Sequence, residues 1–183
     1  MCGRFSVDFR GLFAAVVAAP CAVVAAPFVL AGCGGSGVSR FQPGQWLAVD
    51  QPHKLATLTL RANGNGVSLG NFNGYSRGQV LVEIPAGWRV TVRCVNSSSA
   101  AQSCAIVSNS LSSGPAFAGA ASPNPTTGLD PGSSATFSFL ASRPGVYRIA
   151  SLVDEEEIGN GMWDALQIGG TDKPAVRLLR RLP

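Results

Sequence analysis

Apolar and polar residues alternate with a period of two over most of the chain after residue 53. This alternation predicts strands over residues 55–60, 79–84, 88–95, 105–107, 135–140, 146–152 and 163–168. In residues 88–95, for example, Val90, Val92 and Cys94 fall on one face of the strand. Asn-Gly and Pro-Gly turn signals separate the segments. Seven or eight short strands at this spacing predict an all-β sandwich of roughly 140 residues.

The first forty residues have a different pattern. No charged residue occurs from Gly11 to Gly32, a run of 22 residues that follows Arg4 and Arg10. As a helix this run would be about 33 Å long, enough to cross a hydrocarbon core of roughly 30 Å. Basic residues before an apolar run place the rest of the chain on the extracytoplasmic side. The sequence therefore predicts a periplasmic domain anchored to a membrane by its N-terminal segment.

Two forms of this anchor fit residues 1–33. The segment that ends at Cys33, Leu-Ala-Gly-Cys, resembles the lipobox of bacterial lipoproteins, in which the signal is cleaved and Cys33 would carry the lipid. Alternatively, the run stays as an uncleaved transmembrane anchor, because it is longer than the usual core of a signal peptide. In both forms, residues 34–52 are a tether and pre-strand, with Phe41 and Trp46 available as anchors for a partner.

Composition narrows the chemistry that this chain can perform. Among its 183 residues there is one histidine, His53, which excludes three-His zinc sites and paired-His copper sites. The net charge of +4 arises from dispersed basic residues, so no nucleic-acid partner is expected. Neither a Ser-His-Asp set nor a convergent pair of carboxylates is evident, and we expect that the protein is not an enzyme.

Cysteines divide between the two parts of the chain. Cys2, Cys21 and Cys33 lie in the N-terminal segment, whereas Cys94 and Cys104 lie in the predicted sandwich. In an oxidising compartment an even pair of this kind suggests a disulfide. The alternative is that Cys94 and Cys104 are two small buried thiols.

A string of short motifs resembles the cupredoxin family, and especially its sulfocyanin and rusticyanin-like branch. In order along the chain the motifs are N-F-N-G-Y at 71–75, V-E-I-P-A-G-W at 82–88, Asn96, P-N-P-T-T-G-L-D-P-G at 123–132, P-G-V-Y at 144–147 and G-M-W-D at 161–164. The resemblance implies a cupredoxin-like Greek-key β-sandwich over residues 53–170. A basic C-terminal tail would then occupy residues 171–183.

The same resemblance implies that the copper ligands are largely lost. Blue copper centres use two imidazoles, one Cys thiolate and usually a weak axial Met. The positions of the two imidazoles hold Gln102 and Glu156, the thiolate position holds Ser151, and the axial position keeps Met162. We therefore expect no copper and no other cofactor, and we expect Met162 and Trp163 to belong to the core.

Two charged segments are candidates for partner binding. The acidic loop, which consists of Asp154, Glu155, Glu156 and Glu157, would steer docking to a basic patch, and a bound hard cation is the alternative. The C-terminal tail combines leucines with Arg177, Arg180 and Arg181. It fits a partner groove or anionic headgroups, and the alternative is a solubilising tail.

Together these features favour a structural or accessory subunit that binds protein partners in a membrane complex. By analogy with the fold, the complex would be a respiratory or photosynthetic electron-transfer assembly. Two other functions stay open. One is a copper-binding electron carrier with an atypical site built on Met162 and the acidic loop, and the other is a free ligand-binding lipoprotein.

Overall fold

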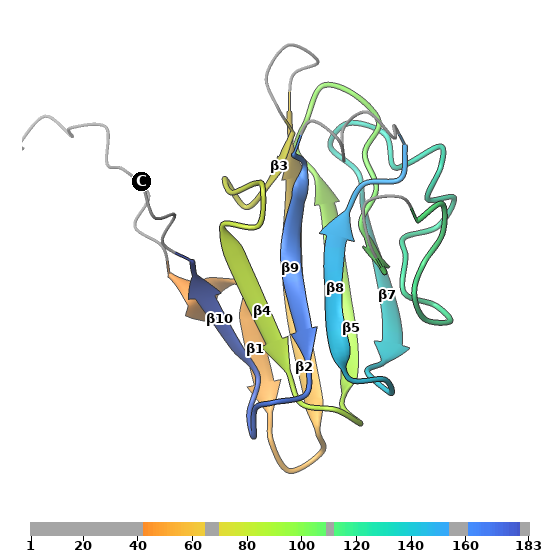
Figure 1. Cartoon of the computed structure of the whole chain (residues 1–183). Coiled ribbons are helices and arrows are strands. Elements are labelled where there is room, and N and C mark those ends of the chain that lie inside the picture. Colours follow the sequence, from red (N-terminus) through yellow and green to blue (C-terminus); the bar gives the residue numbers. More distant parts are fainter. Residues whose placement is uncertain (1–41, 65–69, 109–111, 154–160, 180–183) are drawn as a thin grey trace, which may run out of the picture. The chain divides into compact units, whose positions relative to one another are not determined.

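The computed structural model describes residues 42–64, 70–108, 112–153 and 161–179, and in these residues two β-sheets pack face to face (Figure 1). A single turn of 3-10 helix, η1 (Pro43–Gln45), precedes the first strand. The strands are β1 (Leu47–Asp50), β2 (Leu55–Asn63), β3 (Asn71–Phe72), β4 (Val80–Ile84), β5 (Arg89–Asn96), β6 (Ala105–Val107), β7 (Ser134–Leu140), β8 (Gly145–Ala150), β9 (Trp163–Ile168) and β10 (Ala175–Leu178). The all-β sandwich expected from the alternation is confirmed.

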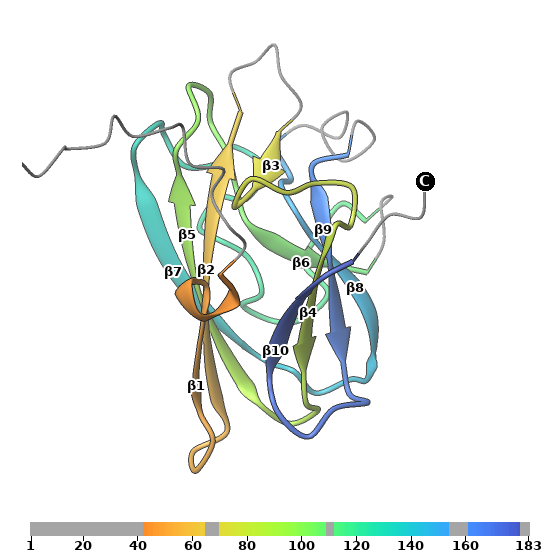
Figure 2. The same ribbon diagram turned by 90° about the vertical axis from the view of Figure 1, so that its left-hand side faces the viewer.

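The two sheets have different strand orders. The first sheet runs β1-β2-β5-β7, with β3 paired to β2, and the second runs β10-β4-β9-β8-β6. The pairs β2–β5 and β4–β9 are parallel, and the other strand pairs in the described residues are antiparallel. Figures 1 and 2 show the sheets as two layers, with β1 and β10 as the edge strands on the same side.

Alternation along each strand places one set of side chains between the sheets. In β2, for example, Ala56, Leu58 and Leu60 are buried, whereas Leu55 and Thr57 are exposed. The main apolar cluster draws residues from both sheets. Each fully buried Val, Leu, Ile or Phe contributes about 1.5–3 kcal/mol. The core therefore follows directly from the period-two pattern.

A disulfide joins Cys94 in β5 to Cys104, which immediately precedes β6, with the two Cα atoms 5.8 Å apart. Both residues are completely buried. The bond links the first sheet to a strand of the second sheet. The structure thus contains the disulfide that the sequence suggested rather than two free thiols.

The tail expected at 171–183 is in part a strand, so that expectation was wrong for residues 175–178. β10 pairs with β4, and Val176 faces the core. The guanidinium of Arg177 forms an ion pair with the Glu83 carboxylate on the neighbouring strand. Only one residue of this short edge strand is buried, which is why its sequence resembled a solvated tail. Arg180 and Arg181 lie outside the described residues.

The sandwich also begins earlier than expected. η1 and β1 precede residue 53, and β1 extends the first sheet through its pairing with β2. The Trp46 ring packs edge-on against the Tyr75 ring, with centroids 5.7 Å apart, so Trp46 belongs to the domain's own packing. Within the described residues no helix has the length and apolarity to cross a membrane. The N-terminal segment, Cys33 and Phe41 lie outside those residues.

Candidate functional site

Three of the four positions assigned to copper ligands lie at one end of the second sheet. Gln102 precedes β6, Ser151 follows β8 and Met162 precedes β9. These three strands are neighbours in the sheet. The topology therefore brings together residues that are up to sixty positions apart in the sequence. The fourth position, Glu156, and the rest of the acidic loop lie outside the described residues.

Ser151 holds backbone amides at this end of the sandwich. Its Oγ atom accepts a hydrogen bond from the Ser103 N–H at 3.2 Å and from the Val153 N–H at 3.5 Å. Ser103 Oγ in turn accepts a hydrogen bond from the Leu152 N–H at 2.8 Å. Ser103 and Ser151 are both fully buried. The hydroxyl at the thiolate position is thus part of a buried network that ties the start of β6 to the end of β8.

Gln102 is fixed by its main chain as well as by its burial. Its N–H donates to the Leu129 carbonyl at 3.1 Å, and its carbonyl accepts from the Leu129 N–H at 2.7 Å. The residue is only 2% exposed. Gly128 permits this close approach, because a Cβ atom built there would lie 3.0 Å from the Gln102 nitrogen and its φ is +80°. The main chain of Gln102 is therefore fixed against the 123–132 loop, and its side chain is buried.

Met162 and Trp163 have different environments. Met162 is fully buried, and its Sδ atom packs so closely on Gly70 that an added Cβ atom would lie 2.3 Å from the sulfur. Trp163 is only partly buried, and the Arg148 guanidinium lies 4.0 Å above its ring. The expectation of a core position therefore holds for Met162. Trp163 falls on the outward face of β9, where it packs against the smaller apolar cluster and is only partly buried.

Asp164 is a buried carboxyl that the sequence interpretation did not single out. It is 3% exposed, and its Oδ1 atom accepts a hydrogen bond from the Val80 N–H at 3.1 Å. Burial raises the pKa of this carboxyl to about 7, against the smaller lowering effect of the Val80 hydrogen bond. The signal was present in the sequence, because Asp164 is in phase with the core residues Leu166 and Ile168.

The donor groups in the described residues do not fit a blue copper centre. Such a centre requires a thiolate and two imidazoles, whereas Ser151 and Gln102, at the positions predicted for the thiolate and for one imidazole, carry a hydroxyl and an amide. His53 belongs to the β1–β2 turn, at the opposite end of β2, where its Nδ1 atom lies 2.8 Å from Asp50 Oδ2. Cys94 and Cys104 form a disulfide and therefore offer no thiolate to a metal. Within the described part of the chain no three His, Cys, Asp or Glu side chains converge as a metal site.

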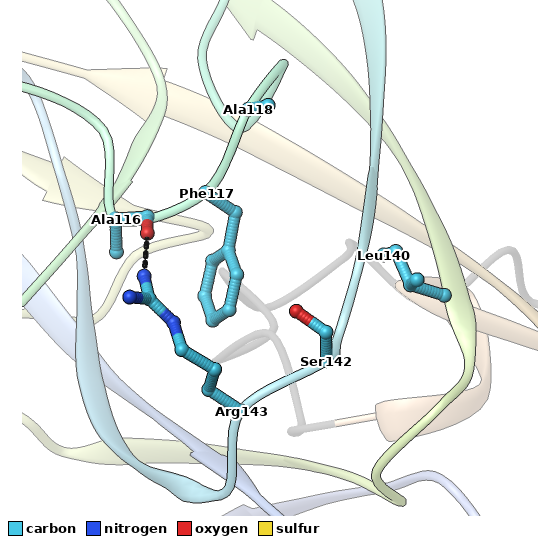
Figure 3. Close-up of a pocket in the computed structure, with 6 residues that line it drawn as sticks. All are labelled: Ala116, Phe117, Ala118, Leu140, Ser142 and Arg143. Atoms are coloured by element: carbon cyan, nitrogen blue, oxygen red, sulfur yellow. Dashed lines mark hydrogen bonds between the residues drawn. The ribbon is translucent and has the colours of Figure 1, made fainter.

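A pocket of about 250 Å³ lies at the other end of β8 (Figure 3). Phe117 forms one wall, and the Arg143 guanidinium donates a hydrogen bond to the Ala116 carbonyl. The same guanidinium lies 5.1 Å from the centroid of the Phe117 ring. The Tyr147 hydroxyl donates to the Arg143 carbonyl at 2.9 Å and fixes the turn beneath the pocket. These contacts show that the residues around the pocket hold the Arg143 turn against the segment that carries Ala116 and Phe117.

Comparison with known proteins agrees with the motifs and the fold. Residues 44–172 match the family model of the sulfocyanin (SoxE) domain. Among solved structures, auracyanin from Roseiflexus castenholzii is 20% identical, with 62% of this chain and 96% of that chain covered and a TM-score of 0.43. A multicopper oxidase from Campylobacter jejuni is 13% identical over 67% of this chain and 28% of that chain, with a TM-score of 0.48.

A third solved structure, the copper nitrite reductase of Nitrosomonas europaea, is 19% identical over 63% of this chain and 41% of that chain, with a TM-score of 0.47. This chain thus spans less than half of the oxidase and of the reductase. No curated protein gives a significant match. The family model covers most of the chain and includes in whole nine of the ten strands found in the described residues. On this ground the chain belongs to the sulfocyanin (SoxE) domain family.

Proposed function

We propose that this protein is a copper-free, membrane-anchored cupredoxin-like subunit that has a structural or accessory role in an electron-transfer membrane complex. The domain would be held at the extracytoplasmic face by residues 1–33, either through a lipid on Cys33 or through an uncleaved helix. The proposal assigns no catalytic step and no bound cofactor to the chain. The acidic loop and the C-terminal arginines would contact the partner proteins.

The observation that carries the copper-free part is the hydrogen bonding of Ser151. Its hydroxyl accepts two backbone N–H groups at the position where a thiolate would bind copper. A hydroxyl is a poor ligand for copper compared with a thiolate, and here its lone pairs are already directed to amides. Gln102 is likewise held by the strand-like pairing with Leu129. These contacts support a role of Ser151 and Gln102 in stabilising this end of the sandwich and not in binding a metal.

Metal analysis tests this part directly. The full chain, purified from native membranes in mild detergent without chelators, is expected to contain far less than one copper per chain and to lack a thiolate-to-copper absorption band. Addition of Cu⁺ or Cu²⁺ is expected to leave the melting temperature unchanged. One tightly bound copper per chain would overturn the proposal and favour an atypical electron carrier. Loss of that copper in the Met162→Leu variant would then identify the sulfur as a ligand.

The accessory role is tested by co-purification. Chains extracted in mild detergent are expected to migrate with haem- or pigment-bearing subunits in constant stoichiometry. Charge reversal of the acidic loop, with Glu155, Glu156 and Glu157 changed to Lys, is expected to release the chain from those subunits. A chain that migrates alone under all extraction conditions would contradict the accessory role and favour a free lipoprotein.

A further inference from the structure

The outward face of the first sheet has an unusual composition. Its strands β2 and β5 are parallel, with Thr57 beside Thr91 and Thr59 beside Arg93. Side chains that alternate with the buried ones therefore gather on one open face. We call this surface the basic face and define it by Thr57, Thr59, Arg61, Arg89, Thr91 and Arg93. All three arginines are exposed.

The charges of the basic face are not neutralised within the described residues. No carboxylate forms an ion pair with Arg61, Arg89 or Arg93 there. Arg61 donates one hydrogen bond to Ser97 Oγ at 2.9 Å, which leaves its charge uncompensated. Asp50, on the edge strand β1, is hydrogen-bonded to His53, and that bond holds the pKa of Asp50 below its usual range.

The outward face of the second sheet is different. There Arg177 is paired with Glu83, and Arg148 is stacked on Trp163. These two arginines thus each have a partner from their own chain. The contrast indicates that the arginines of the basic face are available to a partner outside the domain.

The geometry of the basic face suits a flat anionic surface. Arg89 and Arg93 lie four residues apart on one strand, or about 13 Å, with Thr91 between them. Arg61 lies on the neighbouring strand, two residue pairs beyond the Thr59–Arg93 pair, roughly 8 Å from Arg93. The cations are spread over the sheet and do not converge on one point. Guanidinium groups bind phosphate oxygens through paired N–H donors, and Thr hydroxyls can add further hydrogen bonds.

The place where the described chain enters the fold also favours an anionic surface as the partner of the basic face. The described chain enters the fold through η1 and β1, and β1 is the edge strand of the sheet that carries the basic face. Nine residues, 33–41, separate this entry from the end of the apolar run at Gly32. They span at most about 32 Å when fully extended. An anchor in the bilayer would thus keep the domain within reach of the headgroups.

We propose that the basic face docks flat on anionic phospholipid headgroups of the membrane that anchors the chain. This inference rests on the proposed membrane anchor and adds the orientation of the domain. Each Arg near an anionic surface contributes about 1 kcal/mol, so three arginines give a weak contact that becomes effective because the tether keeps the domain close. Docking would leave the second sheet and its Trp163 directed away from the bilayer.

The test uses the full chain in nanodiscs of neutral phosphatidylcholine or of phosphatidylcholine with 30% phosphatidylglycerol. A photo-crosslinking amino acid replaces Thr91 on the basic face or Gln167 on the opposite sheet face. We expect lipid adducts from position 91 in anionic discs, their loss in neutral discs or at high salt, and none from position 167. No lipid adduct at position 91, or equal adducts at both positions, would overturn the docking.

Two double variants that remove the same charge distinguish the effect of the basic face from the effect of net charge. Arg89→Gln/Arg93→Gln is expected to reduce the affinity of the detergent-free full chain for anionic vesicles about twenty-five-fold, at roughly fivefold for each Arg. The control Arg148→Gln/Arg177→Gln removes the same charge from the other sheet and is expected to have little effect. Equal losses in the two variants would contradict a role of this face.

The anchor and the docking can fail separately. A chain that alkaline carbonate washes out of its native membranes has no anchor, and the proposed function then loses its membrane part. The vesicle assay still tests the basic face in that case. Crosslinking of position 91 to a protein with an acidic surface would overturn the lipid docking and assign the basic face to a protein partner.

Discussion

The sulfur of Met162 lies directly against the main chain of Gly70, in a space that would hold no further carbon atom. Met162 occupies the position that the sequence motifs predict for an axial ligand, and it is fully buried. The contact joins the segment before β3 to the segment before β9. The thioether therefore packs against the main chain, and a substitution at Gly70 tests this contact directly.

Gly70→Ala is expected to destabilise the fold. The new Cβ atom would lie 2.3 Å from Met162 Sδ, and the sulfur has to move within a close-packed core. Overpacking of this kind costs about 1–3 kcal/mol. Urea denaturation followed by intrinsic Trp fluorescence measures the loss. Gly114→Ala is the control, because a Cβ atom there meets nothing within 4 Å. Equal stability of the two variants would contradict the close contact.

Ser151→Ala tests the buried hydroxyl network. The Ser103 and Val153 amides would lose their acceptor and remain buried, which costs about 1–3 kcal/mol in stability. Removal of the exposed hydroxyl by Ser142→Ala is expected to change stability by less than about 0.5 kcal/mol. Thermal melts of both variants make the comparison. A neutral Ser151→Ala substitution would mean that the hydroxyl does not support the end of the sandwich.

The disulfide is expected to contribute about 2–3 kcal/mol, as the chain-entropy relation gives for a loop of ten residues. Cys94→Ala/Cys104→Ala should lower the free energy of unfolding by this amount. The midpoint of wild-type unfolding should fall when reductant is added, whereas that of the double variant should not respond. Alkylation of the unfolded chain with and without prior reduction shows whether these two thiols are free.

Asp164 is expected to make stability fall as pH rises. Its pKa is about 7 in the fold, against an ordinary value of 3.8, so the folded state retains a proton that the unfolded state releases. The stability from this group is complete below pH 3.8 and is lost as pH rises through 7. The full loss is about 4 kcal/mol, at 1.36 kcal/mol for each pKa unit.

Asp164→Asn keeps an oxygen acceptor for the Val80 N–H and cannot ionise. The variant should match the wild-type protein near pH 4 and be more stable at pH 8, as measured by urea unfolding across that range. Asp50→Asn is the contrasting control, because the His53 hydrogen bond lowers the pKa of Asp50 and gives a dependence of opposite sign. An unchanged pH profile in Asp164→Asn would contradict the raised pKa.

The sequence was sufficient to predict the strands that alternate strongly. The predicted segment 55–60 corresponds to β2, and 163–168 corresponds to β9. The strands that it did not predict are short and lie at edges or beside β2. β1, for example, buries little of its surface, and β10 buries only Val176. Edge strands lack a two-sided pattern because much of their surface faces solvent.

The site was predictable in position but not in its internal bonds. The motif order assigned Gln102, Ser151 and Met162 to copper-ligand positions of the family. The structure gathers these three residues at one end of the second sheet. The acceptor role of Ser103 could not be predicted, because its partner Leu152 is 49 residues away and a side-chain hydrogen bond to a distant amide leaves no pattern in a single sequence.

The position of β4 has a consequence for the nascent chain. β4 pairs on one side with β9 and on the other with β10, and both partners come from the last part of the chain. Both edges of this apolar strand therefore stay unpaired until residues 163–178 have been synthesised. Folding of the second sheet has to wait for the C-terminus, and pairing over such separations is slow. Premature termination before β9 would leave β4 as an exposed apolar strand, the kind of segment that aggregates or recruits chaperones.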